Sequence, residues 1–502
     1  MRQQAHPLFR SRSPRACRMN AFGNARWVAL SQLSKIAAQV VIAFVLAKLL
    51  PPAEYGVIAM AGIVTAFAML FRDMGVTAVI IQRAELTSGL MNTAFRLSLV
   101  SSLAVGTIIA ASSPLVSAYF RESALTPVLV LLGLSFPLSG LIAVNQALLE
   151  RESAFKKLAR IEVIANLTGA IASVVAALAG AGVFSLVVLV LVTGILSVVQ
   201  MMFASPWRPG PMTRAESGRY REVLSFSAGV VGFNIVNYFS RNADGLIIGR
   251  LYSASILGAY SLAYRIMLFP LQSLTFVATR SLFPVLADRL RRGESLRAPY
   301  LAVVETISLV VAPMMAGLYL IREQVIGMVF GEQWGLTSEL LKWFAPTGFL
   351  QSVMSISGVV FMATNKPGLL LRLGCIGAFL QVGAFVMAAP YGVERMAEFY
   401  LYANVINFVL VMAVCTRTVG AGFARMLFVM GRSAVCALLM VLALVLVFGA
   451  GLSSSGSSLL WLVSVVLSGS IVYCLLCMVL VPSARALLVG RARKLLVAKT
   501  GV

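Results

Sequence analysis

The chain has 502 residues, of which 60% are hydrophobic and 12% are charged, and its formal net charge is +23. Soluble globular proteins contain about 45–50% apolar and about 25% charged residues, so this composition excludes an ordinary soluble domain and indicates a membrane protein with many spans. The basic charge does not indicate a nucleic-acid-binding domain, because the Lys and Arg residues lie in short connections between apolar runs.

Apolar runs long enough to cross a bilayer recur along the whole chain. A helix needs about 20 apolar residues to span the hydrocarbon core, and helices are expected because lipid offers exposed backbone groups no partner. After a basic tail over residues 1–22, these runs predict an all-α fold with about 14 spans. In chain order the predicted spans are 27–50, 56–82, 91–119, 123–149, 161–179, 182–205, 223–250, 255–283, 299–321, 337–363, 368–389, 394–416, 427–450 and 457–481.

The charges in the connections predict the orientation of these spans. Lys and Arg concentrate in the tail, in alternate connections and after the last span, whereas the intervening connections carry few. Cytoplasmic connections carry an excess of basic residues, so both termini are expected in the cytoplasm. An even number of spans agrees with this orientation.

A short internal repeat suggests a duplicated unit. Residues 46–60 read LAKLLPPAEYGVIAM and residues 248–262 read IGRLYSASILGAYSL, which aligns Lys48 with Arg250 and Gly56 with Gly258. Both stretches join an odd-numbered span to the next one, as two six-helix units in the same orientation would require. We therefore expect a basic tail over 1–22, an N-lobe over 23–222, a C-lobe over 223–416, and two additional helices with a basic end over 417–502.

Polar side chains share single faces of the predicted spans. In the span 223–250 they are Asn234, Asn237, Arg241 and Asp244, within an arc of about 80° on a helix. A similar face of the first span carries Asn24, Ser31, Lys35 and Gln39, and the span 255–283 carries Ser261, Arg265 and Gln272. By the repeat, Lys35 aligns with Asn237 and Gln39 with Arg241, so the first and seventh spans carry equivalent stripes.

A charged side chain at the centre of a membrane helix costs about 2.5–3.5 kcal/mol, so these residues should face one another or a water-filled cavity. One interpretation is internal pairing, of Arg241 with Asp244 and of Arg72 with Asp73, although adjacent residues on a helix do not face each other and the last two are expected to have other partners. Lys35 and Arg265 then have no obvious acid, and Glu305 is one candidate partner for them. The other is a cavity of net positive charge that holds an anion such as phosphate, which Arg binds in a bidentate manner and Lys as a point charge. The acids Asp73, Asp244 and Glu305 either pair structurally or couple transport to H⁺ or Na⁺.

The sequence indicates no metal or cofactor. The one histidine, His6, lies in the tail, which removes His-based triads and His-ligated metals. Cys474 and Cys477 form a C-x-x-C, but no second pair or histidine lies nearby, so we interpret them as small residues packed on one helix.

Several stretches resemble the polysaccharide-transporter family of the multidrug/oligosaccharidyl-lipid/polysaccharide superfamily, the flippases of O-antigen and exopolysaccharide repeat units. The resemblance runs from about residue 23 to about residue 300. The similar stretches are FRDMGVTAVIIQR, LERESAFKKLARIE and GAGVFSLVV. The most specific is SRNADGLIIGR followed by LGAYSLAYRIMLFPLQ and LFPVLADRL. Arg72 departs from the family's pattern at its position, and beyond residue 300 the likeness is mainly helix number and spacing.

The resemblance implies a non-enzymatic transporter of the bacterial inner membrane with two helical lobes around a cationic lumen. Its implied substrate is an undecaprenyl-pyrophosphate-linked oligosaccharide, moved from the cytoplasmic to the periplasmic leaflet, and its implied partners are the polymerase and chain-length proteins of the pathway. Lys35, Arg241 and Arg265 would neutralise the diphosphate. The implied sugar contacts are Asn234, Asn237, Gln39, Gln272, Tyr260 and Tyr264, the tyrosines by stacking.

The sequence also bears on four alternative functions: a multidrug exporter, a flippase of a peptidoglycan precursor, a membrane enzyme and a passive channel. A multidrug exporter of the same superfamily often carries cations and would need an acidic cavity, which the Lys and Arg stripes disfavour. The sequence does not separate the proposed substrate from a lipid-linked peptidoglycan precursor. A membrane enzyme such as an O-antigen ligase is disfavoured, because the longest outward connection, IREQVIGMVFGEQWGLT, is only partly polar and has no histidine. No charged ring or glycine-rich filter indicates a passive channel.

Overall fold

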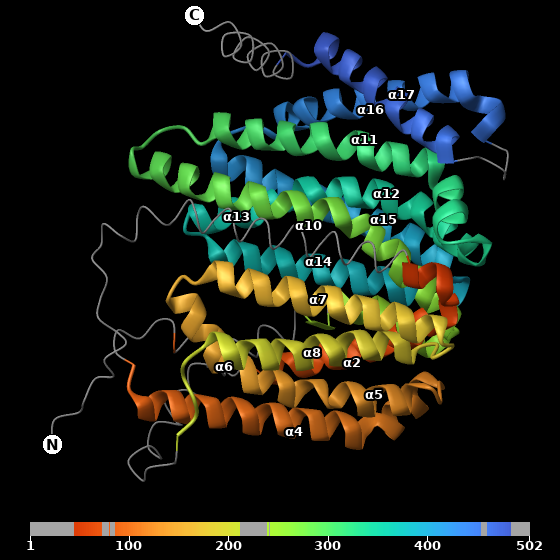
Figure 1. The fold of residues 1–502 in the computed structure, drawn as a ribbon. Coiled ribbons are helices and arrows are strands. Elements are labelled where there is room, and N and C mark those ends of the chain that lie inside the picture. The colour runs from red at the N-terminus through yellow and green to blue at the C-terminus, as the bar shows by residue number, and fades with distance from the viewer. Residues whose placement is uncertain are drawn as a thin grey trace, which may run out of the picture. The chain divides into compact units, whose positions relative to one another are not determined.

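The computed structural model describes residues 45–72, 80, 86–210, 238–239, 241–452 and 459–482; at residues 72, 272–281 and 450–452 it describes the backbone alone. Every regular element in these residues is a helix (Figure 1). The predicted all-α fold class is therefore confirmed.

The chain divides into two compact units, Met1–Gly258 and Ala259–Val502. The lobe boundary expected from the repeat lies earlier, after residue 222, in a stretch outside the described residues. The four predicted segments of the chain thus remain a prediction.

The first unit consists of antiparallel helices joined by short turns. They are α2 (Pro52–Arg72), α4 (Ser88–Phe120), α5 (Leu125–Gly133), α6 (Ser135–Arg151), α7 (Phe155–Leu178) and α8 (Phe184–Ala204). Residues 241–251 are helical as well. The α4 helix packs on α5 and α6, and α7 packs along α8, which in turn contacts α6 (Figure 1).

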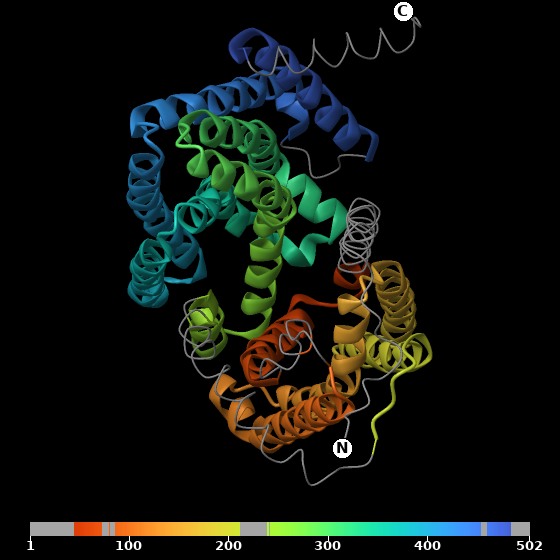
Figure 2. The ribbon, with the colours of Figure 1, turned by 90° about the vertical axis from the view of Figure 1, so that its left-hand side faces the viewer.

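The second unit holds the remaining helices. They are α10 (Ala254–Arg291, which begins in the first unit), α11 (Arg297–Val329), α12 (Gly335–Met354), α13 (Ile356–Ala363), α14 (Pro367–Ala388), α15 (Val393–Val419), α16 (Phe423–Leu452) and α17 (Leu459–Leu480), with 3₁₀ turns η2 (Glu332–Trp334) and η3 (Ala389–Tyr391). The α11 helix packs on α12 and α16, and α15 packs on α12 and α14. Figures 1 and 2 both show α16 and α17, in blue, side by side.

Twelve of the described helical stretches are long and apolar enough to cross a membrane. Each coincides with a predicted span; for example, Phe184–Ala204 matches 182–205 and Pro367–Tyr391 matches 368–389. The other two predicted spans, 27–50 and 223–250, fall largely outside the described residues, although 45–49 and 241–250 are helical. The chain is thus a multi-span membrane protein.

Large apolar side chains stand exposed on the outer faces of these helices. Phe203, Phe379 and Val479 are among the most exposed of them. A water-soluble protein rarely leaves such extensive apolar surface open, whereas lipid tails are as apolar as these side chains. The exposed surface therefore agrees with the composition.

Local sequence chemistry fixes the helix ends. The Thr87 hydroxyl oxygen accepts a hydrogen bond from the Leu90 N–H at 3.3 Å and so caps the start of α4. Gly420 ends α15 with φ of 68°, a left-handed conformation that glycine adopts without steric cost. Pro367 occupies the first turn of α14, where its missing N–H is not needed.

Two aligned glycines of the repeat make reciprocal contacts. A Cβ atom on Gly56 would lie 1.7 Å from the carbonyl oxygen of Ala254, and one on Gly258 would lie 1.9 Å from the carbonyl oxygen of Pro52. Pro52 and Ala254 are themselves aligned by the repeat. The starts of α2 and α10 thus approach each other so closely that only glycine fits at either position, and they do so symmetrically, as a duplicated unit predicts.

Candidate functional site

The helix that carries Arg241 and Asp244 lies against α2. The Tyr238 hydroxyl donates a short hydrogen bond to the carbonyl oxygen of Ile63, and the Phe67 ring centroid lies 5.3 Å from that of Tyr238. A Cβ atom on Gly245 would come within 2.7 Å of Ile63, so the two helices also meet closely about two turns further along, near residue 245. This packing fixes the rotation of the helix.

That rotation separates the two charged residues of this segment. Asp244 is 7% exposed, and its Oδ1 accepts a hydrogen bond from the Gly245 N–H at 2.8 Å. Arg241 is exposed and makes no ion pair with any described residue. The internal pairing of Arg241 with Asp244, one of the two sequence interpretations, is therefore not found within this part of the chain.

Two tyrosines and an arginine stand together in α10. The rings of Tyr260 and Tyr264, one turn apart, stack with centroids 6.2 Å apart and an interplanar angle of 13°. Tyr260 is buried, Tyr264 is half-buried, and Arg265 is exposed. Arg265 forms no ion pair with a described side chain. An aromatic face and an exposed cation thus adjoin on this helix.

A polar network across three further helices holds Tyr264. Its hydroxyl lies 3.4 Å from that of Tyr400 in α15. The Gln351 side chain in α12 donates from Nε2 to the Tyr400 hydroxyl at 2.7 Å and to Asn404 Oδ1 at 2.9 Å. Gln381 in α14 donates to the same Asn404 oxygen at 3.4 Å. Asn404 is buried, whereas Gln351 and Gln381 are half-buried. Hydrogen bonds between amides on different helices help to fix the positions of those helices.

Aromatic rings pack around this network. The Phe344 centroid lies 5.2 Å from that of Tyr260 and 6.1 Å from that of Tyr400, both edge-on, and Phe385 stacks on Tyr400 at 5.1 Å. We define Tyr264, Gln351, Gln381, Tyr400 and Asn404 as the amide–tyrosine network. Of its members only Tyr264 was predicted from the sequence. The signal for the others was amide side chains inside the apolar runs 337–363, 368–389 and 394–416.

Glu305 lies in α11, half-buried, and makes no salt bridge with a described residue, so a pairing with Arg265, which the sequence left open as one alternative, is not found there. Ion pairs between described residues include Arg292 with Asp288 at 2.8 Å, at the end of α10, and Arg395 with Glu398 at 2.5 Å, at the start of α15. In the same residues no three His, Cys, Asp or Glu side chains gather as they would at a metal site.

The remaining predicted site residues have no described side chains. Lys35, Gln39, Asn234, Asn237 and Asp73 lie outside the described residues, and Gln272 belongs to α10 at a position where only the backbone is described. A cationic cavity lined by Lys35, Arg241 and Arg265 therefore stays a prediction.

Sequence comparisons place the chain among polysaccharide biosynthesis proteins. The family described as "Polysaccharide biosynthesis protein" matches residues 45–339, more than half of the chain. The succinoglycan biosynthesis transport protein ExoT of Rhizobium meliloti (strain 1021) is 26% identical over 485 residues, which cover 94% of this chain and 96% of that protein. The teichuronic acid biosynthesis protein TuaB of Bacillus subtilis (strain 168) is 26% identical over 392 residues, 77% of this chain and 80% of that protein.

Solved structures add evidence on the fold alone. The lipid II flippase MurJ in an inward closed conformation superposes with a TM-score of 0.72, 11% identity and coverage of 91% of this chain and 98% of that one. An inward-facing multidrug resistance MATE family transporter of the MOP superfamily superposes with a TM-score of 0.63, 14% identity, and 77% and 95% coverage. Together with the family match, which confirms the resemblance seen in the sequence, these findings show that the chain belongs to the polysaccharide biosynthesis protein family and has the fold of the MOP transporters.

Proposed function

We propose that this protein is a flippase that moves undecaprenyl-pyrophosphate-linked oligosaccharide repeat units from the cytoplasmic to the periplasmic leaflet of the bacterial inner membrane. Relatives named as transport or biosynthesis proteins of surface polysaccharides support the proposal. So does the lipopolysaccharide biosynthesis protein WzxC of Escherichia coli (strain K12), 25% identical over 396 residues, 78% of this chain and 80% of that protein.

The observation that carries the proposal is the pair of exposed arginines, Arg241 and Arg265, which have no ion pair among the described residues. A charge facing acyl chains at a helix centre costs about 2.5–3.5 kcal/mol, so each guanidinium is better placed against water and an anion. Planar, bidentate hydrogen bonding suits phosphate oxygens. In this proposal Arg241, Arg265 and Lys35 hold the diphosphate.

The sugars of the substrate would meet the aromatic side of the same helix. Tyr264 is half-buried next to Arg265, and the amide–tyrosine network orients its hydroxyl. Tyrosine offers an apolar ring to a sugar face and a polar tip to its hydroxyls. Asn234, Asn237, Gln39 and Gln272 remain proposed sugar contacts from the sequence.

The proposed cycle is alternating access with the diphosphate and sugars in a hydrated cavity and the lipid tail left in the bilayer. Transporters built from repeats commonly rock one repeat against the other around a site near the midplane. Asp244, Asp73 and Glu305 are the proposed carriers of a coupling ion.

The test of the proposed function is a deletion strain of a bacterium that carries the protein. We expect loss of one surface polysaccharide while its lipid-linked repeat unit accumulates on the cytoplasmic face, since synthesis continues without export. Mass spectrometry of the accumulated lipid identifies the glycan and also separates this function from transport of a peptidoglycan precursor. Normal surface polysaccharide in a strain without a second such transporter would contradict the proposal.

A further inference from the structure

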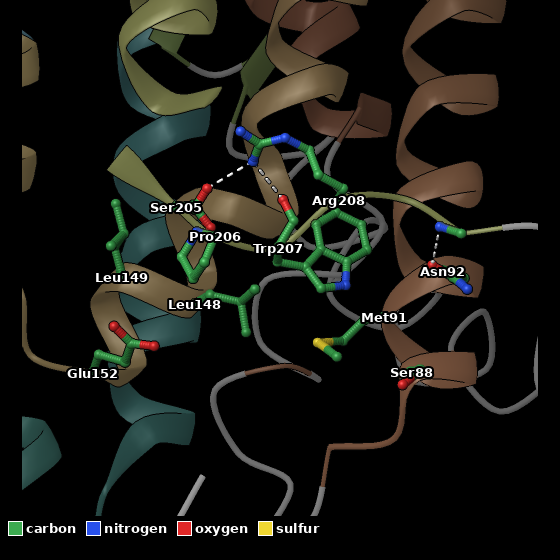
Figure 3. Close-up of a pocket in the computed structure, with 11 residues that line it drawn as sticks. Ser88, Met91, Asn92, Leu148, Leu149, Glu152, Ser205, Pro206, Trp207 and Arg208 are labelled. Carbon is green, nitrogen blue, oxygen red and sulfur yellow. Dashed lines mark hydrogen bonds between the residues drawn. The ribbon is translucent and has the colours of Figure 1, made fainter. Parts of the chain in front are cut away.

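A small pocket in the first unit lies where three helix ends meet. The start of α4, the end of α6 and the segment 205–210 after α8 surround a cavity of about 170 Å³ (Figure 3). The lining residues that matter for binding are Ser88, Asn92, Leu148, Leu149, Glu152 and Trp207. The connection charges predict that this end of the helices faces the cytoplasm, so the pocket would lie at the level of the inner-leaflet headgroups.

The wall formed by residues 205–210 is held in place by specific contacts. Asn92 Oδ1 accepts a hydrogen bond from the Gly210 N–H at 3.0 Å, and Arg96 donates to the Gly210 carbonyl oxygen at 3.1 Å. The ring centroids of Trp207 and Phe95 lie 5.7 Å apart, edge-on. Arg208 donates to the carbonyl oxygens of Ser205 and Trp207 at the end of α8. The pocket is therefore built from fixed groups.

One end of the pocket offers hydrogen-bond donors. Asn92 is 8% exposed, and its Nδ2 makes no hydrogen bond to a described residue, although Oδ1 is bonded. The Trp207 indole N–H likewise has no partner in the described part of the chain, and Figure 3 shows its ring between Leu148 and Asn92. Ser88 begins the 33-residue α4 helix, whose first turn has no acidic residue. The positive end of a helix dipole favours an anion there.

The other end of the pocket carries a negative charge. Glu152, the residue that follows α6, lines the pocket on the side of Leu149, away from Asn92 (Figure 3). Its carboxylate is exposed and forms no ion pair with a described residue. Met91, Leu148 and Leu149 line the space between the two ends. Donors and a carboxylate at opposite ends suit a ligand with an anionic and a cationic group.

The size of the pocket narrows the ligand class. Sites for drug-sized molecules have volumes of about 300–1,000 Å³, and a water molecule takes about 30 Å³ in the liquid. A cavity of about 170 Å³ is therefore too small for an oligosaccharide and has room for a headgroup-sized ligand.

We propose that this pocket binds the phosphoethanolamine headgroup of a membrane phospholipid, independently of the transported glycan. The phosphate accepts hydrogen bonds from Asn92 Nδ2, the Trp207 indole and Ser88 at the start of α4, and the ammonium lies against the Glu152 carboxylate. The acyl chains remain in the bilayer. The bound lipid ties the ends of α4, α6 and α8 together at the membrane surface.

The experiment measures lipid binding to the purified full-length protein by native mass spectrometry, with phosphatidylethanolamine, phosphatidylglycerol and phosphatidylcholine offered singly. The variant Asn92→Asp keeps an oxygen for the Gly210 N–H but replaces the amide donor by a negative oxygen. The variant Glu152→Gln keeps the shape and removes the charge. Asn365→Asp and Glu332→Gln are the matched controls, because both residues are exposed and lie in the second unit.

We expect the wild type to bind phosphatidylethanolamine more tightly than the other two lipids. Asn92→Asp should weaken the binding of phosphatidylethanolamine and phosphatidylglycerol about tenfold, as expected for loss of a hydrogen bond to a charged group. Glu152→Gln should weaken only the phosphatidylethanolamine complex and abolish the preference, and soluble phosphoethanolamine should compete at high concentration.

The proposal is overturned if phosphatidylethanolamine binds no better than phosphatidylglycerol, or if Asn92→Asp behaves like Asn365→Asp. It is overturned equally if a prenyl diphosphate binds this pocket and phosphatidylethanolamine does not. Because no transport is measured, failure of this proposal leaves the proposed flippase function untouched, and the reverse also holds.

Discussion

At the scale of single residues, the two exposed arginines are the most informative groups in the described chain. Arg241 and Arg265 lie on helices otherwise suited to a bilayer, and neither is neutralised by a described acid. If an arginine only neutralised a neighbouring acid, a variant that lacks both the arginine and that acid should still export. If it binds the anionic substrate, loss of the arginine alone should reduce export.

We expect Arg241→Ala and Arg265→Ala each to reduce complementation of a deletion strain by about ten- to a hundredfold, the equivalent of a hydrogen bond to a charged group. Arg265→Lys should retain partial activity, since it keeps the charge but loses the bidentate geometry. Arg292→Ala, which removes an exposed residue paired with Asp288, is the control. Full export by both alanine variants at normal membrane levels would reject a role in substrate binding.

The Tyr400 hydroxyl supports the amide–tyrosine network at the residue scale. Tyr400→Phe removes the acceptor of the Gln351 amide and the neighbour of the Tyr264 hydroxyl. Gln351 is half-buried and keeps its hydrogen bond to Asn404, so loss of one hydrogen bond should cost about 1 kcal/mol, and we expect a lower melting temperature in detergent and weaker export. Tyr391→Phe, at a side chain 73% exposed, should change neither. An unchanged melting temperature for Tyr400→Phe would mean that the network contributes little.

At the scale of elements, the repeat explains a contact that helix propensity would not favour. Glycine near the start of α2 and of α10 weakens each helix but allows the two backbones to touch. Burial follows the same alignment, since Leu46 and Ile248 are both 0% exposed. Equivalent residues therefore share equivalent surroundings in the two copies.

Gly56→Ala and Gly258→Ala should each destabilise the protein by about 1–3 kcal/mol, because the added methyl group would overlap a carbonyl oxygen. Gly62→Ala is the matched control in α2, since no atom lies within 4 Å of its added Cβ, and it should be neutral or stabilising. Thermal unfolding in detergent measures all three. If all three variants melted at the wild-type temperature, the starts of α2 and α10 would be able to move apart at little cost in stability.

At the scale of the whole molecule, the orientation of the helices in the membrane is a prediction from the connection charges. Within each unit, successive described spans run in opposite directions, and the charges of the connections predict which ends are cytoplasmic. In a background without other exposed cysteines, Asn365→Cys should resist a membrane-impermeant maleimide applied to intact cells. Glu122→Cys, in the turn after α4, should react. The opposite labelling pattern would invert the orientation and require the proposed direction of transport to be reconsidered.

The amino-acid sequence by itself determined the helical class and the position of the described spans. Hydropathy over about 20 residues is a local property, and a bilayer leaves a polar backbone one solution, so each span follows from its own residues. The family resemblance was also local, carried by stretches such as SRNADGLIIGR. Turn chemistry at Thr87, Pro367 and Gly420 likewise set helix ends from neighbouring residues.

Only the tertiary structure decided which polar groups meet. Two helices supply the hydrogen-bonded side chains of Gln351, Tyr400 and Asn404. Three helix ends that are far apart in the chain surround the small pocket of the first unit. Helical periodicity places residues on a face but does not say what that face touches. The rotation of each helix is set by close contacts such as those at Gly56, Gly245 and Gly258, which depend on partners distant in the sequence. From periodicity alone, Arg241 and Asp244 share a face of their helix, so pairing was one interpretation of the sequence. In the packed structure Arg241 is exposed and Asp244 is buried.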